Sequence, residues 1–367
     1  MAGPTKVALI GMGMSTTVFH APFILSLPEH FQLSVIFERS ATETSSKARD
    51  RYPGVKVVNT LEQALREDID AVWILSINDT HYDYAKQVLL AGKHVIVEKP
   101  VTPTSVQAYE LAALAKEKNL VLAVYQNRRW DSDYLTVKKL LASGAFGELS
   151  EFESRMDRYK NVPNAKAWKE AALPGAGAAF DLGSHLVDQI LDLFGTPEKV
   201  TGLVRNSRLI GSSEVPDSFT IHLHYPPSPE KGRSLPLLAT ARGSILSLLN
   251  PQPRFLLRGT QASFLKHGVD VQEAQLVANG PDAIKREDYA VEPEVLWGKL
   301  WRLEGRGEAE TVVSEKGDYG AWFKNVAEAL SSSDPSKLIV KPEQAALTIK
   351  ILELAEQSSK EGRSINV

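Results

Sequence analysis

Short apolar runs alternate with amphipathic stretches through the first 127 residues. The apolar runs cover residues 6–11, 33–37, 55–58, 71–76, 94–98 and 120–125. The amphipathic stretches, which have helical spacing, cover residues 60–68, 81–93 and 104–119. Strands that are apolar throughout are typical of a parallel sheet with helices on both faces. The pattern predicts a doubly wound, Rossmann-like α/β domain over residues 1–127.

Two local signals predict where these helices begin and end. Thr104 followed by Gln107 is typical of a capping box, in which each side chain accepts a hydrogen bond from the other residue's free backbone N–H. Gly92, near the end of the helical stretch 81–93, is expected to end the helix in the left-handed conformation.

The pattern changes after residue 127. Apolar and polar residues now alternate within longer runs, which cover residues 148–159, 199–207, 218–225, 236–249, 253–259 and 262–268. Helical patterns occupy residues 134–144, 181–194 and 342–360, and surface loops are expected at 226–234 and 281–294. Alternation favours an open, mostly antiparallel sheet with one solvated face. Residues 128–345 are therefore expected to form an α+β domain, with residues 346–367 packing back on the first domain.

Composition excludes several classes of protein. The 367 residues are 43% hydrophobic and 24% charged, which is typical of a globular fold. Lys and Arg (42) nearly balance Asp and Glu (45), so a phosphate-neutralising nucleic-acid surface is not expected. Cysteine is absent, which excludes disulfides, thiolate metal sites and cysteine nucleophiles. No apolar run approaches the ~20 residues of a membrane span. The buried-strand pattern begins close to Met1, so a signal peptide is not expected. We therefore expect a cytoplasmic protein.

A glycine-rich turn follows the first apolar run. It reads Gly11-Met12-Gly13-Met14-Ser15-Thr16, with Thr16 where the dinucleotide-binding fingerprint has Gly or Ala. Glycine is needed at Gly11 and Gly13 because a Cβ at these positions would occupy the place of the cofactor's diphosphate. A tight turn without a ligand is the alternative. The position of the turn in the first strand–helix unit favours dinucleotide binding.

The end of the second run bears on the choice of cofactor. Glu38 there favours NAD by binding the ribose 2′-OH, whereas Arg39 favours NADP by meeting the 2′-phosphate. Arg39 can also stack on adenine with either cofactor, and Glu38 can instead pair with Arg39. We predict NADP, with NAD as the alternative.

Lys99 follows the fifth apolar run, within Glu98-Lys99-Pro100. Ligands of an open parallel sheet lie outside the carboxyl ends of its strands, so Lys99 is expected beside the nicotinamide. Desolvation and a neighbouring positive ring would lower the lysine pKa and suit it to proton transfer or to polarising a carbonyl. The alternative is a solvated lysine after a strand.

Asp181, His185 and Asp188 are spaced i, i+4 and i+7, which places them on one face of a helix. Three interpretations fit this spacing. Asp181 is an N-cap and His185 an ordinary helix residue; or the three side chains ligate a metal; or they are catalytic.

These motifs together resemble the Gfo/Idh/MocA family of NAD(P)-dependent oxidoreductases. The Gly11-x-Gly13 turn, the Glu98-Lys99-Pro100 strand end and the Asp181-x-x-x-His185 helix carry the resemblance, which covers nearly the whole chain. Residues 126–133, 181–189 and 263–273 are similar to a subgroup that contains NADP-dependent scyllo-inositol dehydrogenases.

The resemblance implies roles for individual residues. Lys99 contacts the substrate hydroxyl, His185 is the general acid or base, Asp181 binds and orients the substrate, and no metal takes part. The residues that it assigns to the cofactor are Gly11, Gly13, Met14, Ser15, Thr16, Glu38, Arg39, Ser76, Asn78, His81, Glu98, Lys99 and Asn127. It also implies that the open sheet packs against a second copy, giving a homodimer or homotetramer.

The predicted reaction is hydride transfer between nicotinamide and a secondary alcohol or ketone of a sugar, polyol or cyclitol. Further substrate-pocket walls are expected from a basic residue and aromatic residues, namely Arg128, Trp130, Tyr159 and Trp168. Two alternatives stay open. The substrate is a dihydrodiol, a keto-sugar or an aldehyde, or the chain is a non-catalytic NAD(P)-binding regulator of the same fold.

Overall fold

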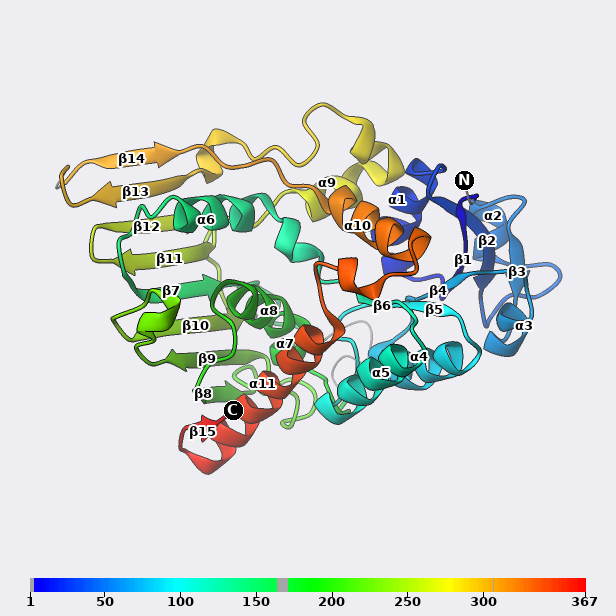
Figure 1. Ribbon diagram of the computed structural model, residues 1–367, viewed down its shortest axis with the longest axis horizontal. Helices are drawn as coiled ribbons and strands as arrows, with labels where there is room; N and C mark the ends of the chain where they lie inside the picture. Colours follow the sequence, from blue (N-terminus) through cyan, green and yellow to red (C-terminus); the bar gives the residue numbers. More distant parts are fainter. Residues whose placement is uncertain (1–2, 164–170, 306) are drawn as a thin grey trace. The chain divides into compact units, whose positions relative to one another are not determined.

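The computed structural model describes residues 3–163, 171–305 and 307–367 (Figure 1). The chain divides into two compact units. Unit 1 comprises Met1–Asn127, Gln272–Tyr289 and Asp318–Ala346. Unit 2 comprises Arg128–Val271, Ala290–Gly317 and Leu347–Val367. Within the described ranges, no helix is both long and apolar enough to cross a membrane.

The sheet of unit 1 has six parallel strands in the order β3-β2-β1-β4-β5-β6. Their bounds are β1 (Thr5–Ile10), β2 (Phe31–Phe37), β3 (Lys56–Val58), β4 (Ala71–Ile74), β5 (His94–Val97) and β6 (Leu122–Val124). The strand order reverses between β1 and β4, and the carboxyl ends of strands at such a point hold the ligand in this class of fold. The predicted Rossmann-type domain is confirmed.

Short helices connect these strands. They are α1 (Ala21–Ser26), α2 (Lys47–Arg51), α3 (Leu61–Leu65), η2 (Asn78–Thr80), α4 (His81–Leu90) and α5 (Ser105–Glu117). Helices α4 and α5 contact each other and lie against β4, β5 and β6 (Figure 1). Helix α4 ends before Gly92, whose φ of 74° confirms the predicted left-handed stop. The capping box predicted at α5 is half formed, because Thr104 accepts from the Gln107 N–H but Gln107 Oε1 has no partner among the described residues.

Two later segments of the chain belong to unit 1, whereas residues 128–345 were predicted to form a single second domain. They contain α9 (Gln272–Asn279), η6 (Gly280–Lys285), α10 (Tyr319–Ser331) and η8 (Pro335–Lys337). Helix α10 brings aromatic side chains to this unit: Phe323 stacks on Phe23 with centroids 4.9 Å apart. Trp322 packs edge-on against Tyr125 at 4.7 Å. Burial of these rings draws the segment into the first unit.

Unit 2 is built on a nine-stranded sheet in the order β14-β13-β12-β11-β7-β10-β9-β8-β15. The bounds are β7 (Leu149–Arg155), β8 (Lys199–Arg205), β9 (Ser218–Tyr225), β10 (Leu237–Ser244), β11 (Pro253–Gly259), β12 (Ala262–His267), β13 (Gly298–Arg302), β14 (Ala309–Val312) and β15 (Ile365–Asn366). Every described pairing in it is antiparallel except that of β10 with β7. The predicted mostly antiparallel sheet is confirmed.

The helical segments of unit 2 differ from the prediction at the helix that carries His185. They are η3 (Asn127–Trp130), which begins at the last residue of unit 1, α6 (Ser132–Ala142), α7 (Ala178–Asp181), α8 (Gly183–Phe194), η5 (Pro229–Lys231) and η7 (Glu294–Leu296). The expected single helix over 181–194 is two helices that meet at Leu182. Helix α8 packs on β7 and β10, against the buried positions of their alternating pattern.

The end of the chain joins the second sheet. From Leu347 onward, helix α11 (Pro342–Glu361) belongs to unit 2, and β15 pairs with β8. The Gly202 N–H donates to Ser358 Oγ at 2.9 Å, and a Cβ on Gly202 would collide with the carbonyl oxygen of Ala355. The prediction that residues 346–367 pack on the first domain is therefore wrong for the tail, because β15 pairs with β8 and forms the last strand of the second sheet.

Candidate active site

The glycine turn has the shape that a diphosphate requires. Gly11 has a φ of 108°, and a Cβ there would lie 3.1 Å from the Leu75 carbonyl oxygen. A Cβ on Gly13 would instead enter space in which no described atom lies within 4 Å. A backbone that leaves room where a side chain would stand fits close approach by a cofactor phosphate.

The environment of Thr16 explains why a threonine can stand where the fingerprint has Gly or Ala. It lies in the π-helical turn η1 (Ser15–His20), which follows the half-exposed Met14. The Thr16 side chain is fully buried, and its hydroxyl donates to the Gly11 carbonyl at 2.7 Å. The hydroxyl is therefore satisfied inside the turn, and it closes the loop that glycine or alanine would leave without this bond.

The Glu98 carboxylate ties the turn to the end of β5. Oε1 accepts from Ser15 Oγ at 2.5 Å and faces His20 Nε2 at 3.0 Å, while Oε2 accepts from the Lys99 N–H at 2.9 Å. Burial raises the pKa of Glu98, but the hydrogen bonds from His20 and Ser15 outweigh it and the pKa is lowered. Glu98 is thus an anion that positions the backbone of Lys99 and the first residue of η1. His20 was not among the predicted site residues; it is fully buried, and its ring centroid lies 4.2 Å from that of Tyr125.

The loops after β4 and β5 lie next to the glycine turn, because β1, β4 and β5 are adjacent. His81, predicted to contact the cofactor, is 1% exposed, and its ring nitrogens lie 2.9 Å from the Pro100 carbonyl and 3.2 Å from the Ser76 carbonyl. Burial lowers the pKa of this imidazole. Ser76 Oγ is hydrogen-bonded to Thr80 at 2.6 Å. The His81 ring therefore lies between the loop after β4 and the loop after β5, and Asn78 begins the short helix η2 within the loop after β4.

The structure separates the two residues that bear on cofactor choice. Glu38 is 5% exposed and accepts from Ser46 Oγ at 2.7 Å and from the Lys47 and Ala48 N–H groups at 3.2 and 3.0 Å. Burial raises the pKa of Glu38, but the hydrogen bonds from Ala48 and Ser46 prevail and lower it. Its carboxylate thus holds the N-terminus of α2. Arg39 is exposed, and no described residue pairs with it.

Asp181 and His185 lie on either side of the break between α7 and α8. Asp181 is the half-buried last residue of α7, and His185 is 6% exposed in the first turn of α8. The N-cap of α8 is Leu182, whose side chain makes no capping bond, so the capping interpretation of Asp181 is wrong. Asp188 is 2% exposed and accepts from Arg129 through both carboxylate oxygens, each at 2.8 Å. It therefore cannot serve as the third ligand of the metal interpretation without losing that pair.

The predicted pocket walls have different environments. Arg128 is 6% exposed and its Nη1 lies 3.2 Å from Asp131 Oδ2, whereas Tyr159 is 53% exposed. Trp130 and Asn127 are buried in η3. Trp168 lies outside the described residues. The Arg128 guanidinium thus forms a buried ion pair with Asp131.

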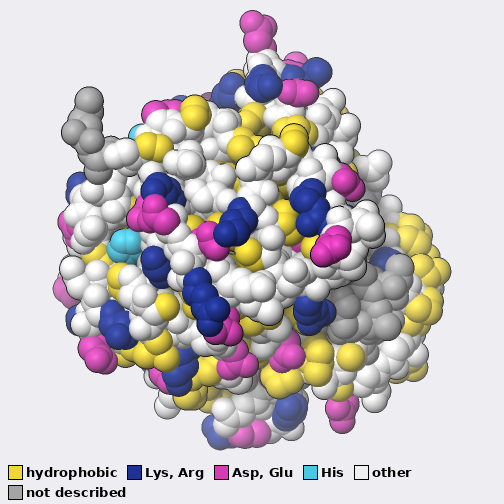
Figure 2. All heavy atoms as spheres, turned by 90° about the vertical axis from the view of Figure 1, so that its right-hand side faces the viewer, with side chains coloured by type: hydrophobic (Ala, Val, Ile, Leu, Met, Phe, Trp, Pro, Cys, Tyr) yellow, Lys and Arg dark blue, Asp and Glu magenta, His cyan; other side chains and the backbone are white. Residues whose placement is uncertain are grey.

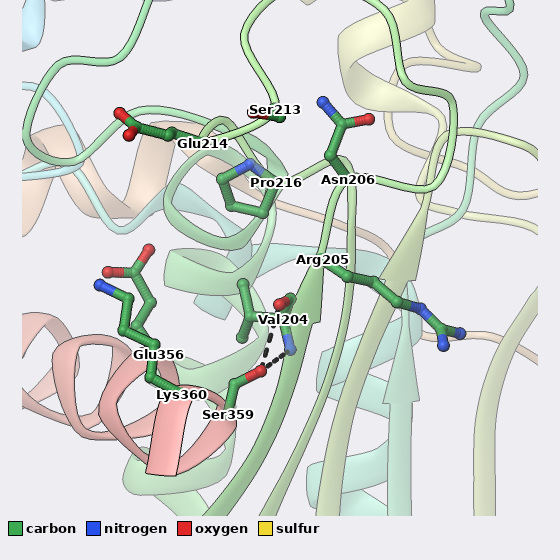
Figure 3. Close-up of a pocket in the computed structure, with 9 residues that line it drawn as sticks. All are labelled: Val204, Arg205, Asn206, Ser213, Glu214, Pro216, Glu356, Ser359 and Lys360. Carbon is green, nitrogen blue, oxygen red and sulfur yellow. Dashed lines mark hydrogen bonds between the residues drawn. The ribbon is translucent and has the colours of Figure 1, made fainter. Parts of the chain in front are cut away.

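A pocket of about 220 Å³ lies elsewhere in unit 2, between the end of β8, the loop after it and α11 (Figure 3). It contains none of the predicted site residues. Ser359 is one of its lining residues, and its hydroxyl accepts from the Val204 N–H at 2.9 Å and donates to the Val204 carbonyl at 3.1 Å (Figure 3). These bonds join the last helix to β8, so the polar lining serves the packing of the two elements.

Charge on the surface agrees with the composition. On the face shown in Figure 2, Lys and Arg side chains are interspersed with Asp and Glu, as expected from a net charge of −3.

Comparison with known proteins agrees with both units. A model of the oxidoreductase family with an NAD-binding Rossmann fold, Gfo/Idh/MocA, matches residues 5–126, and the model of the Gfo/Idh/MocA C-terminal domain matches residues 134–265. The chain belongs to the Gfo/Idh/MocA family. It is an NAD(P)-binding oxidoreductase, and the resemblance predicted from its motifs is confirmed.

Relatives in this family match over nearly their whole length. An uncharacterized oxidoreductase of Schizosaccharomyces pombe, C26H5.09c, is 42% identical over 99% of this chain and 98% of its own. The scyllo-inositol 2-dehydrogenase (NADP+) IolW of Bacillus subtilis is 34% identical over 98% of this chain and 95% of its own. Among solved structures, the oxidoreductase YvaA of Bacillus subtilis superposes with a TM-score of 0.88 at 32% identity, covering 100% of this chain and 99% of that one.

Proposed function

We propose that this Gfo/Idh/MocA protein is an NADP-dependent dehydrogenase or reductase acting on a secondary alcohol or ketone of a polyol, cyclitol or sugar. The order of the strands in unit 1 carries the proposal. The glycine turn follows β1, which borders the switch point of the sheet, and Lys99 follows β5, the neighbour of β4, at the same carboxyl edge. A lysine held there by its neighbour Glu98 is suited to act on the group that reacts with the coenzyme.

The reaction needs one base and one electrostatic donor around the reacting oxygen. When bound, the nicotinamide supplies the hydride acceptor or donor. In alcohol oxidation His185 takes the hydroxyl proton, and the Lys99 ammonium stabilises the negative charge that develops on the oxygen. Asp181 binds and orients the substrate. In ketone reduction Lys99 polarises the carbonyl and His185 returns the proton.

Preference for NADP is supported by the environment of Glu38. An acidic side chain selects NAD by accepting from the ribose 2′-OH. Here that carboxylate already accepts hydrogen bonds from Ser46, Lys47 and Ala48, while the next side chain, Arg39, is exposed. An available guanidinium beside a withdrawn carboxylate suits a 2′-phosphate. The dehydrogenase IolW, a relative at 34% identity, uses NADP+.

Replacing Arg39 by alanine is expected to weaken NADPH binding by about 10- to 100-fold, the effect of losing charge-assisted hydrogen bonds to a phosphate. NADH binding should change little, because NADH has no 2′-phosphate. Fluorescence titration of each reduced coenzyme measures both constants. Arg51→Ala removes another exposed arginine, at the end of α2, and should leave both constants unchanged. Equal loss of NADH and NADPH affinity in Arg39→Ala would show that the side chain stacks on adenine instead.

The reaction class is tested by a panel of inositols, sugars and their ketones, offered with both coenzymes and followed at the absorbance band of reduced nicotinamide. We expect turnover of at least one polyol–ketone pair, with a higher kcat/KM for NADP(H) than for NAD(H). Dihydrodiols and aldehydes belong in the same panel. Tight coenzyme binding without turnover of any of these compounds would instead identify a regulator and refute the proposal.

A further inference from the structure

Helix α8, which carries His185, is anchored through buried polar side chains as well as through apolar packing. Asp188 and Gln189 are 2% and 0% exposed, and the Asp192 side chain is 13% exposed. A buried carboxylate is costly unless it is paired and hydrogen-bonded. The partners of these three side chains therefore determine how the helix is held.

Arg129 holds two successive turns of α8. Its Nε donates to Asp188 Oδ2 and its Nη2 to Asp188 Oδ1, each at 2.8 Å. Its Nη1 donates to Asp192 Oδ1, also at 2.8 Å. Asp188 and Asp192 are one turn apart, so a planar guanidinium that bonds both restricts rotation and sliding of the helix. Apolar contacts alone tolerate such shifts more readily.

Arg128, the residue before Arg129, also bonds the helix, at Gln189, the residue after Asp188. Gln189 Nε2 donates to the Arg128 carbonyl at 2.7 Å. Arg254 Nη2 donates to Gln189 Oε1 at 3.0 Å. Each hydrogen-bonding atom of the Gln189 amide is thus occupied, and the short segment Arg128–Arg129 bonds α8 through both of its residues.

We propose that Arg129 is a positioning residue for His185, setting the orientation of α8 so that the imidazole is presented for proton transfer. His185 precedes Asp188 by three residues, which places the clamp one turn from it. The inference rests on the proposed function of His185. A buried ion pair replaced by apolar residues often costs no stability, so a geometric role accounts better for such a clamp than stability does.

The test is a double-mutant cycle of Arg129→Lys and His185→Asn. Lysine keeps the charge but cannot bond both oxygens of Asp188 together with Asp192. We expect Arg129→Lys to lower kcat by about 10- to 100-fold, as small misplacements of a catalytic group do. The NADPH dissociation constant should stay unchanged, because its predicted ligands are in unit 1. In the His185→Asn background, Arg129→Lys should lower the residual kcat no further.

Glu292→Gln is the matched control. It breaks another buried pair of unit 2, in which Lys266 and Glu292 are both 0% exposed at the side chain and neither contacts α8 through a described polar bond. This variant should lose thermal stability and keep its kcat. The inference is overturned if Arg129→Lys retains wild-type kcat, if it lowers kcat equally with and without His185, or if Glu292→Gln loses as much kcat. A His185→Asn variant with wild-type turnover would refute the proposed function itself, whatever Arg129→Lys does.

Discussion

Replacing His185 by asparagine is expected to lower turnover by about 10²- to 10⁴-fold, the usual contribution of a general acid or base. Lys99→Met should lower it by about 10²- to 10³-fold, because a positioned donor to a developing oxyanion is removed. Neither change should alter the fold, because asparagine and methionine are of similar size to the residues they replace. Steady-state kcat on the best substrate of the panel measures both effects, and the NADPH dissociation constant reports whether unit 1 is intact.

A lysine at the opposite end of β5 provides a control for Lys99→Met. Lys93 immediately precedes β5, at the end opposite Lys99, and its Nζ donates to the Ile69 carbonyl at 2.7 Å. Lys93→Met removes a lysine that flanks β5 at the edge of the sheet where ligands do not bind. It should retain wild-type kcat. A full loss in Lys93→Met, or wild-type turnover in Lys99→Met, would contradict the role given to the end of β5.

The sequence predicts the parallel sheet well because its signal is local. All six strands of unit 1 fall within the apolar runs or overlap them, and the buried positions of β4 and β5 leave little room for polar residues. The return of α10 to that unit has no local signal. Trp322 and Phe323 look like the apolar face of any helix, and only the fold brings them to Tyr125 and Phe23.

The site shows the same limit at the level of side chains. Glu38 was predicted to bear on the cofactor, and Asp188 was a candidate metal ligand or catalytic residue. In the structure, Glu38 accepts hydrogen bonds at the N-terminus of α2, and Asp188 accepts them from Arg129. Ser46, which starts α2, was the available signal for Glu38, since a helix N-terminus attracts a carboxylate. For Asp188 the available signal was Arg129, a basic residue that was given no role in the prediction, next to Arg128, which was predicted as a pocket wall.

Replacing Arg254 by methionine is expected to cost about 3–5 kcal/mol of stability, the usual penalty for leaving a buried charge without its partner. Arg254 and Asp133 both have fully buried side chains, and Nε donates to Asp133 Oδ2 at 2.8 Å. The same guanidinium bonds Ser154 Oγ at 2.8 Å and lies 4.1 Å from the ring centroid of Phe255. Methionine fills the volume over the ring but leaves the carboxylate in the core. Thermal and urea unfolding, followed by tryptophan fluorescence, measure the loss.

Two further variants separate the orphaned charge from the lost packing. Arg254→Met combined with Asp133→Asn removes the uncompensated carboxylate and should recover part of the loss, because a neutral buried amide is less costly than a charge. Arg258→Met, on the same strand β11, breaks an exposed pair with Glu151, whose side chains are 55% and 51% exposed. Such a pair is worth about 0–1 kcal/mol. If the double variant were no more stable than Arg254→Met, the penalty would come from the lost hydrogen bonds to Ser154 and Gln189 and the lost contact with Phe255. The buried ion pair would then not be what stabilises this part of unit 2.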